Sequence, residues 1–574
     1  MIAPRVFRAA ALALATCGSL AAGVAAVDTP AGNSAPAPSA QAVTAPQFEI
    51  VAMRRITEAQ YRNSIADIFG PDVRVAGRFE PVVRPVHELI ASGAREASIS
   101  PAGLEQFDAM ARGIAAQVFD EAHRSQFAES QPADAGKPDA SCAAKVLTPL
   151  GRLLFRRPLT GAERDFYVKL ASDSAAQTGS FYKGLELSLS AMLDSPNFLY
   201  VVETSEPDPA NPGALRLDNY TRASRLGFML WNSTPNEALL QAAEQGKLSD
   251  PAALSGIVGR MVNSPRFEQG LRAFFSDMLL FEKFDELAKD PVIYPYFNQD
   301  VAKALPEQTL RTITAHLLGK GGDYRALFTT PNTFMNRSLG PLYQVPVHKS
   351  SGWEPYQFAP GDDRAGLLGQ AGFLSIYSHS GRSSPTLRGR AIRELLMCQP
   401  VPNPPGNVNF TAVQDVHNKA TPTARSRLSA HSTDEVCAGC HKITDPVGLS
   451  LERFDGIGAF RATENDTPID SSGILDGLHF AGAAGLGKTL ASSPDTTQCV
   501  SSRALQYATG LGSEDVSPWV ENLDKQFAAS GYGIRALFLK VVTMPETWQV
   551  KPTPVDPNQS LGGATKISFS GQRR

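Results

Sequence analysis

One pentapeptide, Cys437-Ala438-Gly439-Cys440-His441, constrains this chain more than any other stretch. Two thiols three residues apart, with an imidazole directly after them, form the pattern by which a c-type haem is attached. Each thiol can add to one vinyl group of the same porphyrin, and the adjacent His441 then lies under the iron as its axial ligand. The pattern predicts one covalent haem c, held by Cys437, Cys440 and His441.

The alternatives to a haem at this motif are half of a zinc site or a plain structural loop. A zinc site of the finger type needs a second pair of Cys or His ligands at suitable spacing. Downstream of the motif only His479 and Cys499 occur, and they form no such pair. The sequence therefore favours the haem.

The first residues have the composition of a secretory signal. Two arginines precede an Ala-rich apolar run, and small residues follow it up to Ala26, which predicts a signal peptide over residues 1–26. A transmembrane anchor is disfavoured because the run is short of a bilayer span, and a lipoprotein box at Cys17 fits poorly because Thr16 precedes it. We expect a periplasmic or otherwise exported protein, with lipoprotein anchoring as the weaker alternative and no transmembrane span in the mature chain.

Three cysteines remain once the signal peptide and the haem motif are set aside, namely Cys142, Cys398 and Cys499. An exported protein folds in an oxidising compartment, where disulfides form and persist. We therefore expect one disulfide among the three, with one thiol left over. The sequence does not choose the pair.

Length and composition fit several globular units with a sizeable buried core. The chain has 574 residues, of which 43% are apolar and 19% are charged, and a disordered chain would be poorer in apolar residues. The formal net charge is −3, which gives no electrostatic attraction to nucleic acid or to an anionic membrane. We expect neither as a partner.

Helix start signals recur along the chain. Thr57 with Gln60, and Thr160 with Glu163, have the spacing of capping boxes. Apolar residues at helical spacing follow these starts, and sustained two-residue alternation is absent from residues 217–343. The pattern predicts a mainly α protein of several helical units, with a c-type cytochrome-like haem segment near the C-terminus.

Breaks in composition divide the chain into eight segments. Stretches rich in Pro, Gly and Ser mark loops and boundaries, and the segments at the two ends have too few large apolar side chains to fold. The expected organisation is a signal peptide at 1–26, a disordered linker at 27–48, an N-terminal helical unit at 49–135, a second helical unit at 140–203, a large central helical domain at 215–345, a haem c attachment domain at 364–475, a C-terminal helical domain at 485–549 and a disordered tail at 550–574.

Five groups of residues carry a family resemblance. They are Arg54–Tyr61 with Asp67–Gly70, Phe155–Thr160 with Ser195–Tyr200, Arg225–Pro235, Cys437–His441 with Asp445–Gly448 and Glu452–Gly458, and Leu505–Gly510. In this order they resemble the multi-domain c-type cytochrome-like proteins of planctomycetes and myxobacteria, built from domains of unknown function 1587, 1595, 1592, 1588 and 1585. The resemblance implies an exported, haem-binding protein whose activity is unsettled.

Residues after the haem motif have expected supporting roles. Asp445-Pro446 should turn the chain after the ligand helix, and Gly448 should allow close approach to the porphyrin. Arg453 and Arg461 are candidates to pair with haem propionates, since a guanidinium fork matches a carboxylate. Their alternative is an ordinary surface charge.

The sixth iron ligand decides between electron transfer and catalysis, because Met or His closes the site and an open position admits a small substrate. Met544 is the only methionine after His441, and we take it as the first candidate. Its alternative is an apolar helix end in the core of the last unit. The competing candidates are Met397, His379, His417, His431 and His479.

Two classes of function remain, and both use the haem. The first is an exported mono-haem c-type cytochrome-like protein that acts in periplasmic electron transfer or as a haem-dependent oxidoreductase, with a redox partner protein or an unknown substrate. The second is a structural or binding protein of the cell envelope with haem as an accessory. No dinucleotide-binding fingerprint, nucleophile elbow or P-loop occurs in the sequence, and we favour the redox class.

Overall fold

The computed structural model describes residues 49–127, 130–403, 419–431 and 435–550. The predicted signal peptide and linker, nearly all of the predicted tail, and His417 lie outside these residues. The side chains of His431 and Cys437 also lie outside the described part, although both positions fall within helices.

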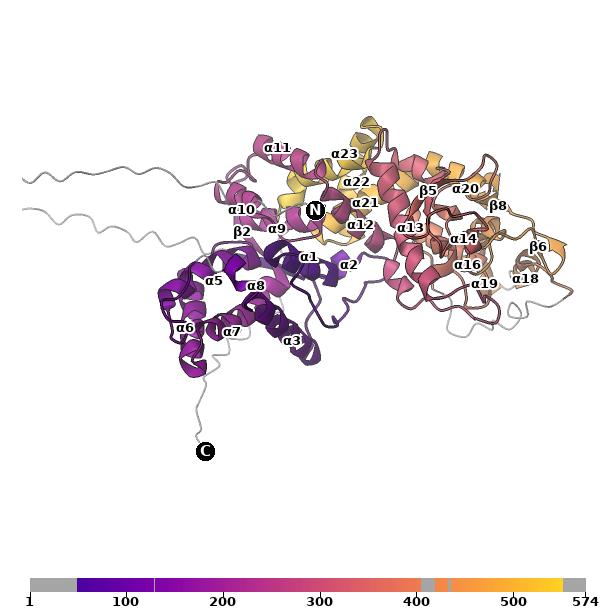
Figure 1. Ribbon diagram of the computed structural model, residues 1–574. Coiled ribbons are helices and arrows are strands. Elements are labelled where there is room, and N and C mark those ends of the chain that lie inside the picture. The colour runs from indigo at the N-terminus through magenta and orange to yellow at the C-terminus, as the bar shows by residue number, and fades with distance from the viewer. Residues whose placement is uncertain (1–48, 128–129, 404–418, 432–434, 551–574) are drawn as a thin grey trace, which may run out of the picture. The chain divides into compact units, whose positions relative to one another are not determined.

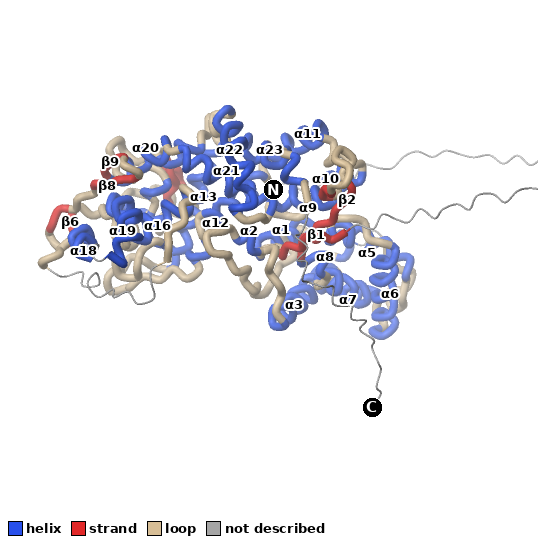
Figure 2. Tube along the Cα trace, turned by 180° about the vertical axis from the view of Figure 1, so that it is seen from behind, coloured by secondary structure: helices blue, strands red, loops and turns tan. Residues whose placement is uncertain are grey.

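Helices form most of the described chain, and its strands are short (Figures 1 and 2). The prediction of a mainly α protein is confirmed. Both predicted capping boxes form, with Thr57 before α1 (Glu58–Phe69) and Thr160 before α6 (Gly161–Thr178). In each box the threonine hydroxyl accepts from a backbone N–H three residues on, and the side chain there accepts from the threonine N–H. Two donors at each helix start are thereby satisfied.

The N-terminal helices pack around one hydrophobic core. The ring of Tyr61 lies at its centre, with centroid distances of 5.9 Å to Phe107 and 5.2 Å to Phe198. A three-stranded antiparallel sheet in the order β1-β2-β3 completes this part. Its further elements are β1 (Glu49–Arg55), α3 (Pro101–Val118), α4 (Arg124–Phe127), α5 (Ala140–Phe155), α7 (Phe181–Leu193), α8 (Pro196–Leu199), β2 (Tyr200–Pro207) and β3 (Leu215–Leu217). The short helix α2 (Ile90–Gly93) contributes Ala91 to the largest core instead.

The predicted central and C-terminal domains share the largest core. The ring of Phe274 lies 5.5 Å from that of Tyr507 and 5.3 Å from that of Phe538, so residues more than 200 positions apart in sequence form one packed interior. The helices are α9 (Asn219–Trp231), α10 (Glu237–Glu244), α11 (Pro251–Val262), α12 (Phe267–Met278), α13 (Gln299–Leu318), α20 (Gly482–Ser492), α21 (Pro494–Thr509), α22 (Ser513–Ala529), α23 (Ile534–Thr543) and the 3₁₀ turn η6 (Pro545–Trp548).

A smaller core lies beside α13. Its short elements are β4 (Asn332–Met335), α14 (Gly340–Tyr343) and β5 (Glu354–Gln357), while η1 (Phe281–Phe284) and α15 (Ala371–Ile376) contribute to both this core and the largest one. The turns η2 (Tyr324–Phe328) and η3 (Leu367–Gly369) pack into the largest core. The region that follows holds the haem motif, and in it α16 and α19 lie side by side (Figures 1 and 2). Its elements are α16 (Pro385–Ala391), η4 (Ile392–Leu396), α18 (Ala424–His431), α19 (Glu435–Gly448), η5 (Leu449–Leu451), β6 (Thr463–Glu464), β7 (Thr467–Pro468), β8 (Ser472–Leu475) and β9 (Leu478–Ala481).

The predicted disulfide forms between Cys398 and Cys499, which are 101 residues apart in sequence. It ties the segment after η4 to helix α21. Cys142 is the thiol left over and is buried in α5, where its Sγ donates to the carbonyl of Ser130 at 3.0 Å. The expectation of one disulfide is confirmed, and the structure supplies the pairing.

Within the residues that the structure describes, no helix combines the length and the apolar character needed to cross a membrane.

Candidate functional site

Helix α19 carries the haem motif, with Cys440 and His441 in its second turn. Both side chains are partly buried and line a cavity of about 340 Å³, which we call the α19 cavity. Its walls come from the loop before α16, from α16 itself, from the segment after η4, and from α18 and α19. In the described part of the chain no group of three or more His, Cys, Asp or Glu side chains is placed to hold a metal ion by itself.

An aspartate one helical turn away orients the His441 ring. The Nδ1 atom of His441 lies 2.7 Å from Oδ2 of Asp445, and the other carboxylate oxygen accepts from the Thr386 hydroxyl at 2.8 Å. This hydrogen bond raises the pKa of His441 against the opposing effect of burial. A carboxylate on one ring nitrogen fixes the tautomer of a histidine that ligates metal through the other, so Nε2 is the nitrogen suited to iron.

The predicted turn at Asp445-Pro446 does not form. Helix α19 continues through Pro446 to Gly448, although proline removes one hydrogen bond from a helix interior. The reason lies in packing, because α16 and α19 approach each other through two glycines. A Cβ atom at Gly389 would overlap the carbonyl of Thr444, and one at Gly448 would overlap the carbonyl of Pro385. The close backbone approach expected at Gly448 therefore exists, but it is to helix α16.

The arginines that line the α19 cavity are not the two that the sequence suggested as partners of haem propionates. Arg382, Arg390 and Arg427 are the arginines among its lining residues. Burial lowers the pKa of Arg382, and the positive charge of Arg427 lowers it further, so two cationic groups lie near each other in the wall. Arg453 and Arg461 are not lining residues. Arg453 pairs instead with Asp363 at 2.8 Å, and Arg461 pairs with Glu452 at 2.8 Å.

One candidate sixth ligand shares the cavity with His441. His379 lines it from the loop between α15 and α16. Burial, followed by the positive charges of Arg382 and Lys289, lowers the pKa of His379 and favours the neutral imidazole that metals bind. The loop is held in place by the Lys289 ammonium, which donates to the Ser375 carbonyl at 2.8 Å, the Ser378 hydroxyl at 2.7 Å and the His379 carbonyl at 3.0 Å.

The other candidate ligands with described side chains lie elsewhere. Met544 follows the end of α23 and belongs to the largest core, and Met397 belongs to the same core. His479 lies on β9. None of the three is among the lining residues of the α19 cavity, so the structure does not bring Met544 together with His441.

A fully buried arginine, Arg388, links helix α16 to its neighbours beside the α19 cavity. The guanidinium of Arg388 on α16 donates to the carbonyls of Leu374, Leu451 and Phe454 at 3.1, 3.0 and 2.8 Å, and further to the Asp455 carbonyl. It also lies 3.5 Å from the Glu452 carboxylate. Burial lowers the pKa of Arg388 to about 10. This single side chain joins α16, one wall of the cavity, to α15 and to the segment after α19.

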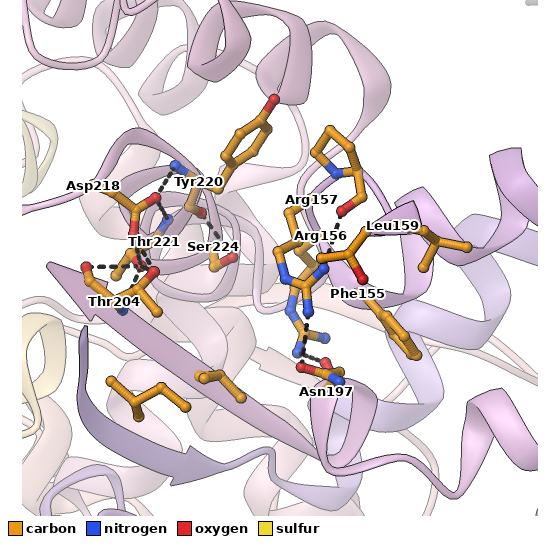
Figure 3. A pocket seen from close by; sticks show the side chains of 14 residues that line it. Phe155, Arg156, Arg157, Leu159, Asn197, Thr204, Asp218, Tyr220, Thr221 and Ser224 are labelled. Carbon is orange, nitrogen blue, oxygen red and sulfur yellow. Dashed lines mark hydrogen bonds between the residues drawn. The ribbon is translucent and has the colours of Figure 1, made fainter. Parts of the chain in front are cut away.

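The motifs at Phe155–Thr160 and Ser195–Tyr200 meet at a separate cavity of about 520 Å³ (Figure 3). Arg156, at the end of α5, donates to the carbonyls of Asn197, Phe198 and Tyr200. Asp218 caps α9 and accepts from the hydroxyls of Thr204 and Thr221. These polar groups are bonded to one another or to backbone, and the two motifs therefore hold helices together at this cavity.

Comparison with protein-family models gives five matches, each described as a protein of unknown function. In chain order they are DUF1587 at residues 54–120, DUF1595 at 142–203, DUF1592 at 217–345, DUF1588 at 364–464 and DUF1585 at 476–546. The five domains inferred from the sequence motifs, and their order, are thereby confirmed. The α19 cavity falls entirely within the DUF1588 match. No curated protein and no solved structure gives a significant match.

Proposed function

The chain belongs to the proteins built from DUF1587, DUF1595, DUF1592, DUF1588 and DUF1585 in this order, and from that premise we propose that it is an exported mono-haem c-type cytochrome-like protein. Cys437 and Cys440 would bind the haem covalently, with His441 as its axial ligand. The observation that carries the proposal is the α19 cavity, onto which the second thiol and the imidazole of the motif both open. A bound haem supplies a one-electron couple, which suits periplasmic electron transfer.

The residues of the α19 cavity fit a porphyrin. Apolar side chains in its walls, such as Leu387, Val401 and Leu428, suit the ring, and a guanidinium fork suits each propionate. The three lining arginines come from three segments. Two of them already pair with carboxylates, Arg390 with Glu394 and Arg427 with Glu464, so the propionates would share these guanidinium groups with protein carboxylates. A volume of about 340 Å³ lies within the usual range for cofactor and ligand sites.

His379 takes precedence over Met544 as the sixth ligand in this proposal. Among the histidines whose side chains the structure describes, it is the one that lines the α19 cavity together with His441, and Lys289 holds its loop. A second strong-field ligand closes the iron to small molecules and favours an electron carrier over an open catalytic site.

Haem attachment is tested on full-length protein exported from a host that matures c-type cytochromes. Acid–acetone extraction followed by a pyridine haemochrome assay should show one haem that stays with the protein. Cys440→Ala should give a haemochrome with one thioether bond, and Cys437→Ala with Cys440→Ala should lose covalent haem. Cys142→Ala is the matched control and should retain it. Freely extracted haem, or a zinc-containing protein without a Soret band, contradicts the proposal.

Axial ligation is tested by spectroscopy. The wild type should be low-spin and its reduced form should bind carbon monoxide poorly, while His379→Ala should be high-spin and bind carbon monoxide readily. His441→Ala should change the reduced spectrum and the midpoint potential while thioether bonds persist. Met544→Ala is the comparison variant and should keep the wild-type spectrum. A low-spin spectrum unchanged in His379→Ala rules this histidine out, and a high-spin wild type overturns the carrier function.

A further inference from the structure

A third pocket lies where strand β1 ends and helix α1 begins. It has a volume of about 400 Å³, and we call it the Arg54 pocket. Arg54, Thr57 and Gln60 line it from the β1–α1 segment, Ser276 lines it from α12, and Tyr507 lines it from α21. Parts of the chain matched by three different family models therefore build one pocket.

Arg54 has no partner in this pocket. Its residue is only 7% exposed, yet among the described residues its guanidinium makes no hydrogen bond and no ion pair. Its neighbour Arg55 shows the ordinary arrangement, with bonds to the Glu80 carbonyl at 2.9 Å and the Ser98 carbonyl at 2.8 Å. An unpaired buried guanidinium is costly, because desolvation of the charge is not offset.

The charges behind Arg54 leave an excess of positive charge. One carboxylate, Glu203, is bound by Arg225 at 2.6 and 2.8 Å and lies 4.0 Å from Arg95. Burial lowers the pKa of Arg54; Glu203 opposes that effect, and the charges of Arg225 and Arg95 add to it. Arg95 is also attracted by Asp515, so three guanidinium groups face two carboxylates, of which Glu203 is the one that acts on Arg54.

The carboxylates that line the pocket already have partners. Asp277 accepts from the backbone N–H groups of Ile90 and Ala91 at 2.8 and 3.1 Å and pairs with Arg84 at 2.9 Å. Glu282 pairs with the same Arg84 at 2.6 Å. The lining Arg272 is also paired, with Glu307. Arg54 is therefore the charge that the pocket leaves unmatched.

The start of helix α1 adds to the positive potential. Thr57 is the N-cap of this 12-residue helix, and Ala59 and Gln60 in its first turn line the pocket. The capping box already occupies the N–H groups of Thr57 and Gln60, so the helix start contributes its dipole rather than those donors, and the dipole favours negative charge nearby. The unpaired guanidinium and the helix start are two independent features that favour negative charge at one place.

We propose that the Arg54 pocket binds a small organic monocarboxylate, with its carboxylate on Arg54 and its apolar body against the remaining wall. Apolar groups of Ala59, Ile90, Ala273 and Phe281 form part of that wall, which suits a hydrocarbon chain or ring. A doubly charged phosphate is disfavoured because Asp277 and Glu282 line the same pocket. The volume of about 400 Å³ lies at the small end for ligand sites.

The test uses titration calorimetry on the full chain with benzoate and hexanoate as probes. Benzamide is the neutral analogue of benzoate, and inorganic phosphate is the competing anion. At least one carboxylate should bind, benzamide should not, and Arg54→Met should weaken binding by roughly 10- to 100-fold, the loss of one charge-assisted hydrogen-bonded pair. Arg62→Met, on α1 but outside the pocket, is the matched control and should bind as the wild type does.

A second variant covers the case in which Arg54→Met does not fold. Ala273→Phe keeps the charge and fills the pocket, so it should abolish binding. The proposal is overturned if neither carboxylate binds, or if Arg54→Met or Ala273→Phe binds a carboxylate as tightly as the wild type does. Phosphate binding that matches or exceeds carboxylate binding and depends on Arg54 overturns the assignment to carboxylates.

Discussion

The region around α19 and the region around the Arg54 pocket each bury an arginine, and they treat it in opposite ways. Arg388 on α16 donates to four backbone carbonyls and lies beside Glu452. Arg54 on β1 is nearly as well buried and, among the described residues, donates to none. A buried guanidinium surrounded by acceptors acts as a structural joint. A buried guanidinium without acceptors destabilises the fold, because its desolvation is not offset. Proteins usually retain such destabilising groups at functional sites.

The largest effect expected from this comparison is at Arg388. Arg388→Leu should lower the free energy of unfolding by about 3–5 kcal/mol, because Glu452 loses one of its buried partners and four carbonyls lose a donor. Urea unfolding of the full chain measures this. Arg164→Leu, which removes an exposed pair with Asp165, is the control and should change stability by less than about 0.5 kcal/mol. A loss below about 1 kcal/mol for Arg388→Leu would break the comparison.

The disulfide connects the two regions, since it ties the segment after η4 to α21, the helix that carries Tyr507 of the Arg54 pocket. Replacing Cys398 and Cys499 together by serine should lower stability by about 2–5 kcal/mol, because the open loop restores chain entropy to the unfolded state. Calorimetry with and without reductant measures the loss. Reductant should leave the double variant unchanged, and a wild-type melting temperature in that variant would contradict the prediction.

Replacing Arg54 should change the free energy of unfolding in the opposite direction from replacing Arg388. Arg54→Met removes an unpaired buried charge and keeps an apolar chain of similar length, so stability should equal that of the wild type or exceed it by up to about 2 kcal/mol. The same urea experiment compares it directly with Arg388→Leu. A loss of stability as large as that of Arg388→Leu would show that Arg54 is another structural joint.

Asp194 is a carboxyl group that, like Arg54, is removed from water without a full set of hydrogen-bond partners. Burial, and then the neighbouring Asp108, raise its pKa to about 7, and one of its oxygens has no hydrogen-bond partner. Because the folded-state pKa lies above the unfolded value, ionisation of Asp194 destabilises the fold progressively as the pH rises from about 4 to about 7. Asp194→Asn should therefore match the wild type below pH 4 and become modestly more stable above it, up to a plateau beyond pH 7. Melting temperatures across this range measure the difference, and a constant difference would contradict the assignment.

Features that depend on neighbouring residues were predictable from the sequence. The capping boxes at Thr57 and Thr160 involve contacts over three residues, and the mainly α character follows from helical spacing. The number of disulfides followed from the cysteine inventory and the expected compartment. The pairing of Cys398 with Cys499 did not, because it depends on how α21 packs against the segment after η4.

Features that depend on tertiary packing were missed or misplaced. Pro446 suggested a turn, but the close contact of α19 with α16 keeps it helical. Arg453 and Arg461 follow the haem motif in sequence, whereas Arg382 and Arg427 reach the α19 cavity from separate segments. The isolation of Arg54 leaves no trace in the sequence, since adjacent Arg54 and Arg55 look alike there and differ only in what surrounds them.

The reciprocal glycines of α16 and α19 have a mechanical consequence. Gly389 faces the backbone of α19, and Gly448 faces the backbone at the start of α16, so the two helices touch main chain to main chain at both ends of their contact. Sliding either helix along the other would drive carbonyl groups into Cα atoms, which makes the pair behave as a rigid frame. Any adjustment to a change of charge in the α19 cavity must then come from side chains and from the loop that carries His379. In the proposed electron carrier, such a stiff frame with small adjustable parts would keep the energy of structural rearrangement low when the haem gains or loses an electron.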